Sequence, residues 1–123
     1  MKLNKPKYHF FKNTKYALDG LKDAFQNESS FRLQILAFIF FGITALYLPI
    51  ENIYKAILVV SLFFNIIAET INSAIERVVD LCTSEIHPLA KNAKDLGATI
   101  VFLTINLTVL IWFLVLAFAF KII

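Results

Sequence analysis

Three long hydrophobic runs, separated by short polar segments, dominate the pattern along the chain. They predict membrane-spanning helices at about residues 31–48, 53–80 and 96–120, because a helix needs about 20 residues to cross a hydrocarbon core of about 30 Å. The second helix becomes polar after Ala68 without a helix breaker, so its C-terminal part should extend beyond the membrane surface. Pro49 follows the first run and should end its helix, which makes the first two spans an antiparallel hairpin.

An amphipathic segment precedes the first span. It predicts a helix over about residues 10–26 that lies on the membrane surface. Most of the residues between its apolar positions are polar, and several of them are lysines. A soluble helix packed on other protein would show the same pattern. The apolar positions at helical spacing are Phe10, Ala17, Leu21 and Phe25. Residues 1–8 are basic and contain Pro6, which predicts a loose tail.

The composition is that of a membrane protein with one domain. The chain has 123 residues, of which 59% are hydrophobic and 17% charged, whereas soluble domains are about half apolar and about a quarter charged. A chain of this length cannot bury so much apolar surface inside itself, so the excess must face lipid or other copies of the chain. We therefore expect an all-α integral membrane protein with three transmembrane helices and one surface helix.

Basic residues flank the predicted spans. Lysines next to spans favour the cytoplasmic side, so the N-terminus and the polar loop at 82–95, with Lys91 and Lys94, should be cytoplasmic. Pro88 should break any helix in that loop. No nucleic-acid partner is expected, because the sequence has no recognisable nucleic-acid module. The lysines before the first span are Lys2, Lys5, Lys7, Lys12, Lys15 and Lys22.

Four polar residues share one face of the second predicted helix. At about 100° per residue, Glu69, Asn72, Glu76 and Asp80 lie at about 0°, 300°, 340° and 20°. Ionisable groups near a membrane span are costly and indicate a functional site. A solvated acidic face at the cytoplasmic end of the helix is the alternative. It suits Asp80 better than Glu69, because a mostly apolar stretch leads directly into Glu69.

The residue types on this face suit a particular chemistry. Carboxylate and amide oxygens are hard ligands for Mg²⁺, which completes its shell with water and nucleotide phosphates. A carboxylate deeper in the membrane could instead accept a proton from a lipid hydroxyl. The sequence has no Gly-rich phosphate-binding loop, so a phosphate-transfer site would have to be built without one. By pattern alone, Glu28 could equally be a helix cap, His87 a loop residue and Lys94 a topology-setting lysine.

The run from Glu69 to Asp80 resembles the signature E-x-x-N-[ST]-A-I-E-x-x-V-D of the prokaryotic diacylglycerol kinase family. The segments 15–28 and 84–95 also resemble that family, and the similarity covers about residues 10–120. The resemblance implies a homotrimer in the bacterial inner membrane, with active sites shared between neighbouring chains. It also implies Mg²⁺-dependent transfer of the ATP γ-phosphate to a membrane lipid hydroxyl.

The resemblance further implies roles for individual residues. Glu69 would be the general base, and Glu28 and Glu76 would hold the metal together with the ATP phosphates. The lipid would lie near Phe31, Glu69 and Trp112. The ATP site would be formed by Tyr16, Glu28, Asn72, Glu76, Asp80, Glu85, His87, Lys94 and Asp95.

The resemblance implies phosphoryl transfer to a lipid, but different stretches resemble family branches with different lipid acceptors. The stretches 76–81 and 87–91 resemble the undecaprenol kinase branch, whereas 27–32 and 95–97 resemble the diacylglycerol kinase branch, and we expect diacylglycerol. Undecaprenol is the alternative acceptor.

Two positions depart from the family's pattern. His9 stands where members often carry Arg at the nucleotide, and Gln34 replaces an acid at the lipid site of the best-known members. A small ion-transport subunit is a remote third interpretation. It would require polar residues along every span, yet the first is almost wholly apolar, and Thr44 is the one polar residue in its interior.

Overall fold

The computed structural model describes residues 7–123, so most of the predicted tail at residues 1–8 lies outside the described part of the chain. The described residues form four helices. Three of them, α2 to α4, are long and apolar enough to cross a membrane, which confirms the predicted all-α membrane fold. The helices are α1 (Phe10–Asn27), α2 (Ser29–Tyr47), α3 (Asn52–Cys82) and α4 (Pro88–Ala119).

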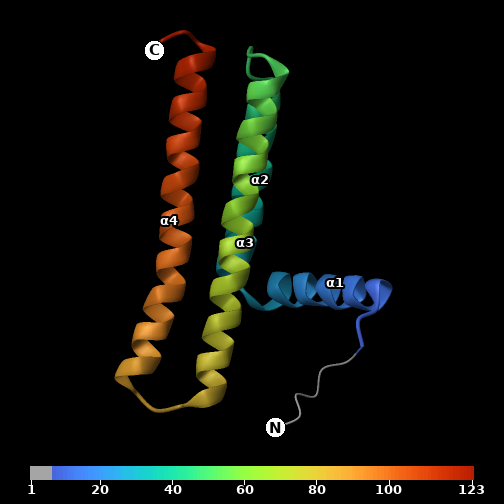
Figure 1. Cartoon of the computed structure of the whole chain (residues 1–123), viewed down its shortest axis with the longest axis vertical. Coiled ribbons are helices and arrows are strands. Elements are labelled where there is room, and N and C mark those ends of the chain that lie inside the picture. Colours follow the sequence, from blue (N-terminus) through green and yellow to red (C-terminus); the bar gives the residue numbers. More distant parts are fainter. Residues whose placement is uncertain (1–6) are drawn as a thin grey trace.

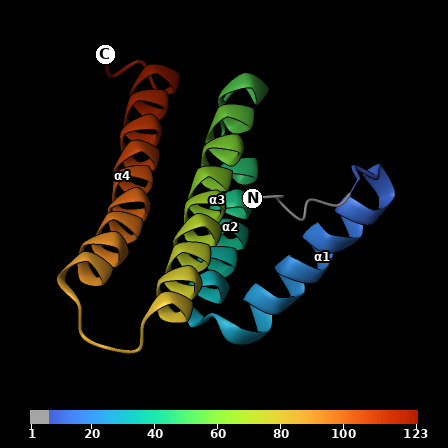
Figure 2. The same cartoon turned by 60° about the horizontal axis from the view of Figure 1, so that its bottom comes forward.

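The three long helices run alongside one another, and α1 projects sideways away from the bundle, crosswise to the long helices (Figure 1). Helix α3 packs against both α2 and α4, and its contact with α4 is the more extensive. Turning the molecule shows α1 leaving the bundle at the start of α2, on the side away from α4 (Figure 2). The end that carries α1 therefore also carries the C-terminal part of α3 and the start of α4.

The chain changes direction at Glu28, which is extended and separates α1 from α2. Arg32 stabilises this corner, because its Nη1 donates to the carbonyl oxygens of Phe25 at 2.8 Å and Gln26 at 3.1 Å. These oxygens belong to the last turn of α1, where carbonyl groups have no partner within the helix. Arg32 thus sets the direction in which α1 leaves the bundle.

The α2–α3 hairpin forms at Pro49, as the sequence predicts. The side chain of Lys55 crosses the hairpin, and its Nζ donates to the carbonyl oxygen of Leu46 at 2.9 Å. This contact gives the free C-terminal carbonyl of α2 a charged partner. It also explains how a lysine is accommodated near the start of an otherwise apolar helix.

The expectation that Pro88 breaks a helix was wrong. Pro88 is the first residue of α4, which therefore begins well before residue 96. Proline suits this position because its fixed φ is helical and the first turn needs no backbone N–H donor. His87 caps the helix, since its Nδ1 accepts a hydrogen bond from the Leu89 backbone N–H at 3.1 Å. The connection between α3 and α4 is correspondingly short.

Candidate functional site

The predicted polar face of α3 lies against α4. Glu69 is only 4% exposed, and Asn72 and Ser73 of the same face are also buried. Glu76 is partly buried one turn further on, and Asp80 is exposed at the end of the helix. The face therefore passes from a buried carboxylate at Glu69 to a solvent-accessible one at Asp80.

Asn72 is held between Glu76 and α4. Its Nδ2 donates to Glu76 Oε1 at 3.3 Å, while its buried Oδ1 has no hydrogen-bond partner among the described residues. Gly97 of α4 lies opposite, and a Cβ there would overlap Asn72 Oδ1 and come within 3.5 Å of Asn72 Cγ. The absence of a side chain at Gly97 is what leaves room for the Asn72 amide.

A second group of buried polar residues lies deeper in the membrane part of the α3–α4 contact. Asn65 Nδ2 donates to Thr108 Oγ1 at 3.0 Å, and Trp112 Nε1 donates to Ser61 Oγ at 3.1 Å. Asn65 and Ser61 were not predicted as parts of the polar face. At helical spacing both lie on the side of Asn72 and Glu76, so extending the same period towards the start of α3 would have found them.

A cavity of about 390 Å³ opens beside this group, between α2, α3 and α4. Its lining is mostly apolar, with Gln34, Asn65, Thr108 and Trp112 as polar positions. Asn65 is 8% exposed, and its Oδ1 has no hydrogen-bond partner within residues 7–123. Trp112 also packs edge-on against Phe41, with ring centroids 5.6 Å apart. Trp112 and Gln34, both expected near the lipid from the family resemblance, thus line the same cavity.

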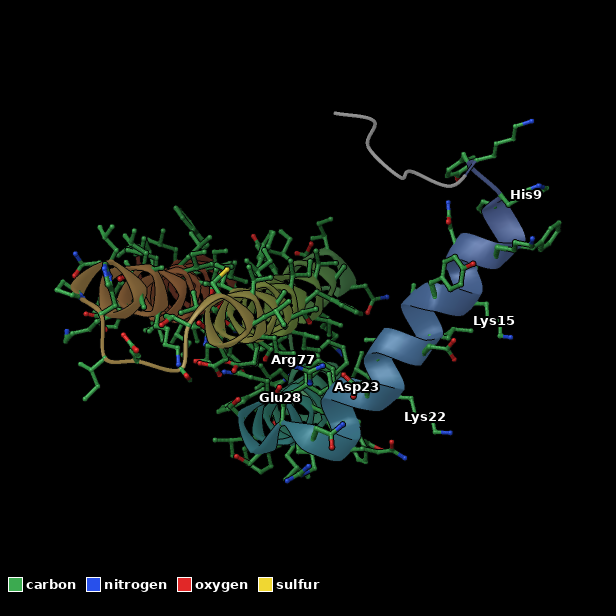
Figure 3. The ribbon with its side chains drawn as sticks, turned by 90° about the horizontal axis from the view of Figure 1, so that it is seen from below. His9, Lys15, Lys22, Asp23, Glu28 and Arg77 are labelled. Carbon is green, nitrogen blue, oxygen red and sulfur yellow. The ribbon has the colours of Figure 1, made fainter. Side chains whose placement is uncertain are left out.

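An ion cluster joins the end of α1 to α3 (Figure 3). Arg77 donates to Glu28 Oε1 through Nη2 at 2.8 Å and Nε at 3.1 Å, and through Nη1 to Asp23 Oδ2. The hydrogen bond from Arg77 to Asp23, and secondly that from Asn27, hold the pKa of the Asp23 carboxyl below its ordinary value of 3.8. The cluster brings Glu28 to the turn of α3 that carries Glu76, although Arg77 was not among the predicted site residues.

A second hollow, of about 610 Å³, lies where the α3–α4 connection meets the two helices. Lys94 Nζ donates to Asp80 Oδ1 at 2.6 Å, and Lys91 Nζ donates to Asp95 Oδ2 at 2.6 Å. The pairs give the hollow two ammonium groups beside two carboxylates. The predicted nucleotide residues that line it are Asp80, Glu85, His87, Lys94 and Asp95.

Other predicted residues lie apart from these hollows. Tyr16 is 58% exposed on α1, and α1 extends away from its own bundle. Phe31 is buried in the first turn of α2 and does not line the cavity of Trp112. Across the described residues, no three His, Cys, Asp or Glu side chains gather as a metal cluster. Glu28 and Glu76 could therefore offer a metal two carboxylates, with its remaining ligands supplied from elsewhere.

The sequence matches the family model described as prokaryotic diacylglycerol kinase over residues 15–116. The chain belongs to the prokaryotic diacylglycerol kinase family. It is therefore an enzyme, a lipid kinase of the multi-pass membrane type. The signature run Glu69–Asp80 that indicated this family includes the buried Glu69 and Asn72 of α3 and the Asn72–Glu76 hydrogen bond.

Individual relatives cover most of the chain. A protein of Helicobacter pylori named diacylglycerol kinase is 37% identical over 102 residues, which are 83% of this chain and 80% of the relative. The diacylglycerol kinase of Escherichia coli is 37% identical over 97 residues, 79% of this chain and 80% of the relative. That of Haemophilus influenzae is 37% identical over 105 residues, 85% and 88% of the two chains.

Proposed function

We propose that this kinase transfers the γ-phosphate of ATP to the free hydroxyl of diacylglycerol, giving phosphatidic acid, with Glu69 as the general base. The observation that carries the proposal is the burial of Glu69, an acid 4% exposed on a membrane helix. A buried carboxylate is kept at such a position for a function rather than for stability. Glu69 accepts the hydroxyl proton as that oxygen attacks the γ-phosphorus and ADP leaves.

The acceptor lipid is proposed to enter the cavity between α2, α3 and α4. Its mostly apolar lining and volume of about 390 Å³ suit part of an acyl chain. Asn65 lines this cavity one helical turn from Glu69, so a chain held there would bring its polar end towards the carboxylate. The relatives named above are diacylglycerol kinases, which favours diacylglycerol over undecaprenol.

A Mg²⁺ ion fits the residues on this face. The carboxylates of Glu28 and Glu76 are hard oxygen ligands, and Glu76 is held in place by Asn72, whose unpartnered Oδ1 faces Gly97 of α4. Glu28 and Glu76 would hold the ion together with the ATP phosphates, where it would neutralise charge on the phosphates. Asn72 orients Glu76 through its Nδ2 hydrogen bond at 3.3 Å.

ATP is proposed to bind in the hollow at the α3–α4 connection. Lys94 and Lys91 supply positive charge for phosphate groups, and Asp80 and Asp95 hold their ammonium groups in place. His87 and Glu85 line the same hollow. Since ATP is cytoplasmic, this end of the bundle and α1 should face the cytoplasm of a bacterium across its inner membrane.

The working enzyme is proposed to be a homotrimer with shared sites. Tyr16 is a proposed ATP contact, yet α1 carries it away from the bundle of its own chain. A neighbouring chain would bring its own bundle to that part of α1. The many exposed apolar residues of α2 and α4 are available for contacts with lipid and with such neighbours.

Phosphoryl transfer can be tested on the purified protein in mixed micelles with γ-labelled ATP. We expect label in phosphatidic acid when diacylglycerol is supplied, with turnover lost when Mg²⁺ is chelated and restored when it returns. If label appears only in undecaprenyl phosphate, the acceptor is undecaprenol instead of diacylglycerol, and the proposed phosphoryl transfer from ATP still holds. Label in neither lipid would contradict the proposed function and would favour ion transport.

A further inference from the structure

Arg77 is the residue through which α3 holds the end of α1. Within the described part of the chain, every hydrogen bond between the α1–Glu28 segment and α3 comes from its guanidinium. The partners are distant in sequence, since Glu28 is 49 and Asp23 is 54 residues from Arg77. Figure 3 shows the three side chains converging where α1 meets the bundle.

The guanidinium treats the two oxygens of Glu28 differently. Both Nε and Nη2 of Arg77 donate to Oε1, and in residues 7–123 Oε2 receives no hydrogen bond from protein. The third arm, Nη1, is used by Asp23. One oxygen of Glu28 is therefore fixed by the protein, and the other is left available for a further cation.

We infer that Arg77 is a positioning residue for the kinase reaction, which holds Glu28 beside Glu76 so that its Oε2 can bind the metal. The inference rests on the proposed role of Glu28 as a metal ligand. Arg77 acts through Glu28 and needs no contact with substrate. Asp23 accepts a hydrogen bond from the same guanidinium and so helps to hold the end of α1 against α3.

Charge and geometry both support this role. Asp23 and Glu28 would place two negative charges at one corner, and Arg77, the residue after Glu76 on α3, is the cation that the structure puts between them. Exposed ion pairs are usually weak, but a guanidinium shared by two carboxylates is a network with fixed directions. A lysine ammonium would supply the charge without the planar fork, so Lys at position 77 should restore the role only in part.

The test compares Arg77→Gln, Arg77→Lys and Asp23→Asn with the matched control Lys22→Gln. Lys22 neighbours Asp23, is exposed, and lies on the side of α1 away from Arg77. Two quantities are measured on full-length protein in lipid nanodiscs. The first is the hydrogen–deuterium exchange of residues 18–28 without metal or nucleotide, and the second is the Mg²⁺ dependence of the rate at fixed ATP and lipid.

For Arg77→Gln we expect exchange in residues 18–28 to rise about tenfold, and the Mg²⁺ concentration for half-maximal rate to rise about tenfold. The rate at saturating Mg²⁺ should stay within about twofold, because Arg77 touches no reacting atom. Arg77→Lys should give intermediate values. Asp23→Asn should raise exchange and leave the Mg²⁺ dependence unchanged, and Lys22→Gln should change neither.

The inference is overturned if Arg77→Gln has the Mg²⁺ dependence of the Lys22→Gln control, whatever its exchange. It is also overturned if the loss in Arg77→Gln appears only as a lower rate at saturating Mg²⁺. Failure of the proposed function looks different, since the unsubstituted chain would then phosphorylate no lipid at any Mg²⁺ concentration. Even if the chain phosphorylates no lipid, the exchange measurement remains informative. If residues 18–28 of Arg77→Gln exchange as slowly as those of Lys22→Gln, Arg77 is not the residue that holds α1.

Discussion

Gly97 of α4 lies so close to Asn72 of α3 that a Cβ at position 97 would overlap the Asn72 amide oxygen. Changing Gly97 to Ala should therefore turn the Asn72 side chain and break its hydrogen bond to Glu76. Misplacing a residue of this site should lower the kinase rate by about 10- to 100-fold. Steady-state phosphorylation of diacylglycerol at saturating MgATP measures the loss.

Gly20→Ala is the matched control, because a Cβ at that position meets nothing within 4 Å. It should leave the rate unchanged and stabilise α1 by about 0.5–1 kcal/mol. Equal rates for Gly97→Ala and the unsubstituted protein would show that the kinase reaction does not need the Asn72–Glu76 hydrogen bond.

The Asn65–Thr108 hydrogen bond joins α3 to α4 inside the membrane part of the bundle. Thr108→Val keeps the shape of the side chain and leaves Asn65 Nδ2 without its acceptor. The free energy of unfolding should fall by about 0.6–1.7 kcal/mol, the range of hydrogen bonds between membrane helices. Reversible unfolding in mixed detergent measures it, with Thr44→Val as control because Thr44 bonds only within its own exposed helix face. An equal loss in both variants would contradict the special role of Thr108.

The Asp23 carboxyl should titrate below its ordinary pKa of 3.8, chiefly because Arg77 hydrogen-bonds to it and secondly because Asn27 does. A lowered folded-state pKa means that this contact stabilises α1 at every pH above 3.8. The stabilisation is lost as the pH falls below that value, through the folded-state pKa. The carboxyl carbon shift of Asp23, followed by NMR against pH, reports the pKa directly. Arg77→Gln should raise that pKa towards 3.8, and an unchanged titration would show that Arg77 does not set it.

The helices could be predicted closely because their limits follow from hydropathy and one proline. Helices α1, α2 and α3 end within two residues of the predicted positions. The start of α4 was misplaced because proline has opposite effects inside a helix and at its first residue. The hydropathy of the segment after Pro88 is low, so nothing apolar marked the beginning of the helix there.

The candidate site was predictable where residues share one helix, and less so where they meet across helices. Period 3.6 placed Glu69 with Glu76, but isolated polar residues such as Asn65 were discounted within an apolar run. Arg77 was missed because its carboxylate partners are 49 and 54 residues away, and a charged residue past the membrane end is usually solvated. Gly97 was missed because its effect is steric and depends on the close approach of α3 and α4.

The central claim is that Glu69 accepts the proton of the lipid hydroxyl, and Glu69→Gln tests it most directly. Turnover of diacylglycerol with γ-labelled ATP should fall by about 10²- to 10⁴-fold, while MgATP binding and assembly of the chains stay as in the unsubstituted protein. Glu51→Gln, an exposed acid at the far end of α3, should keep full activity. Full activity of Glu69→Gln would contradict the account.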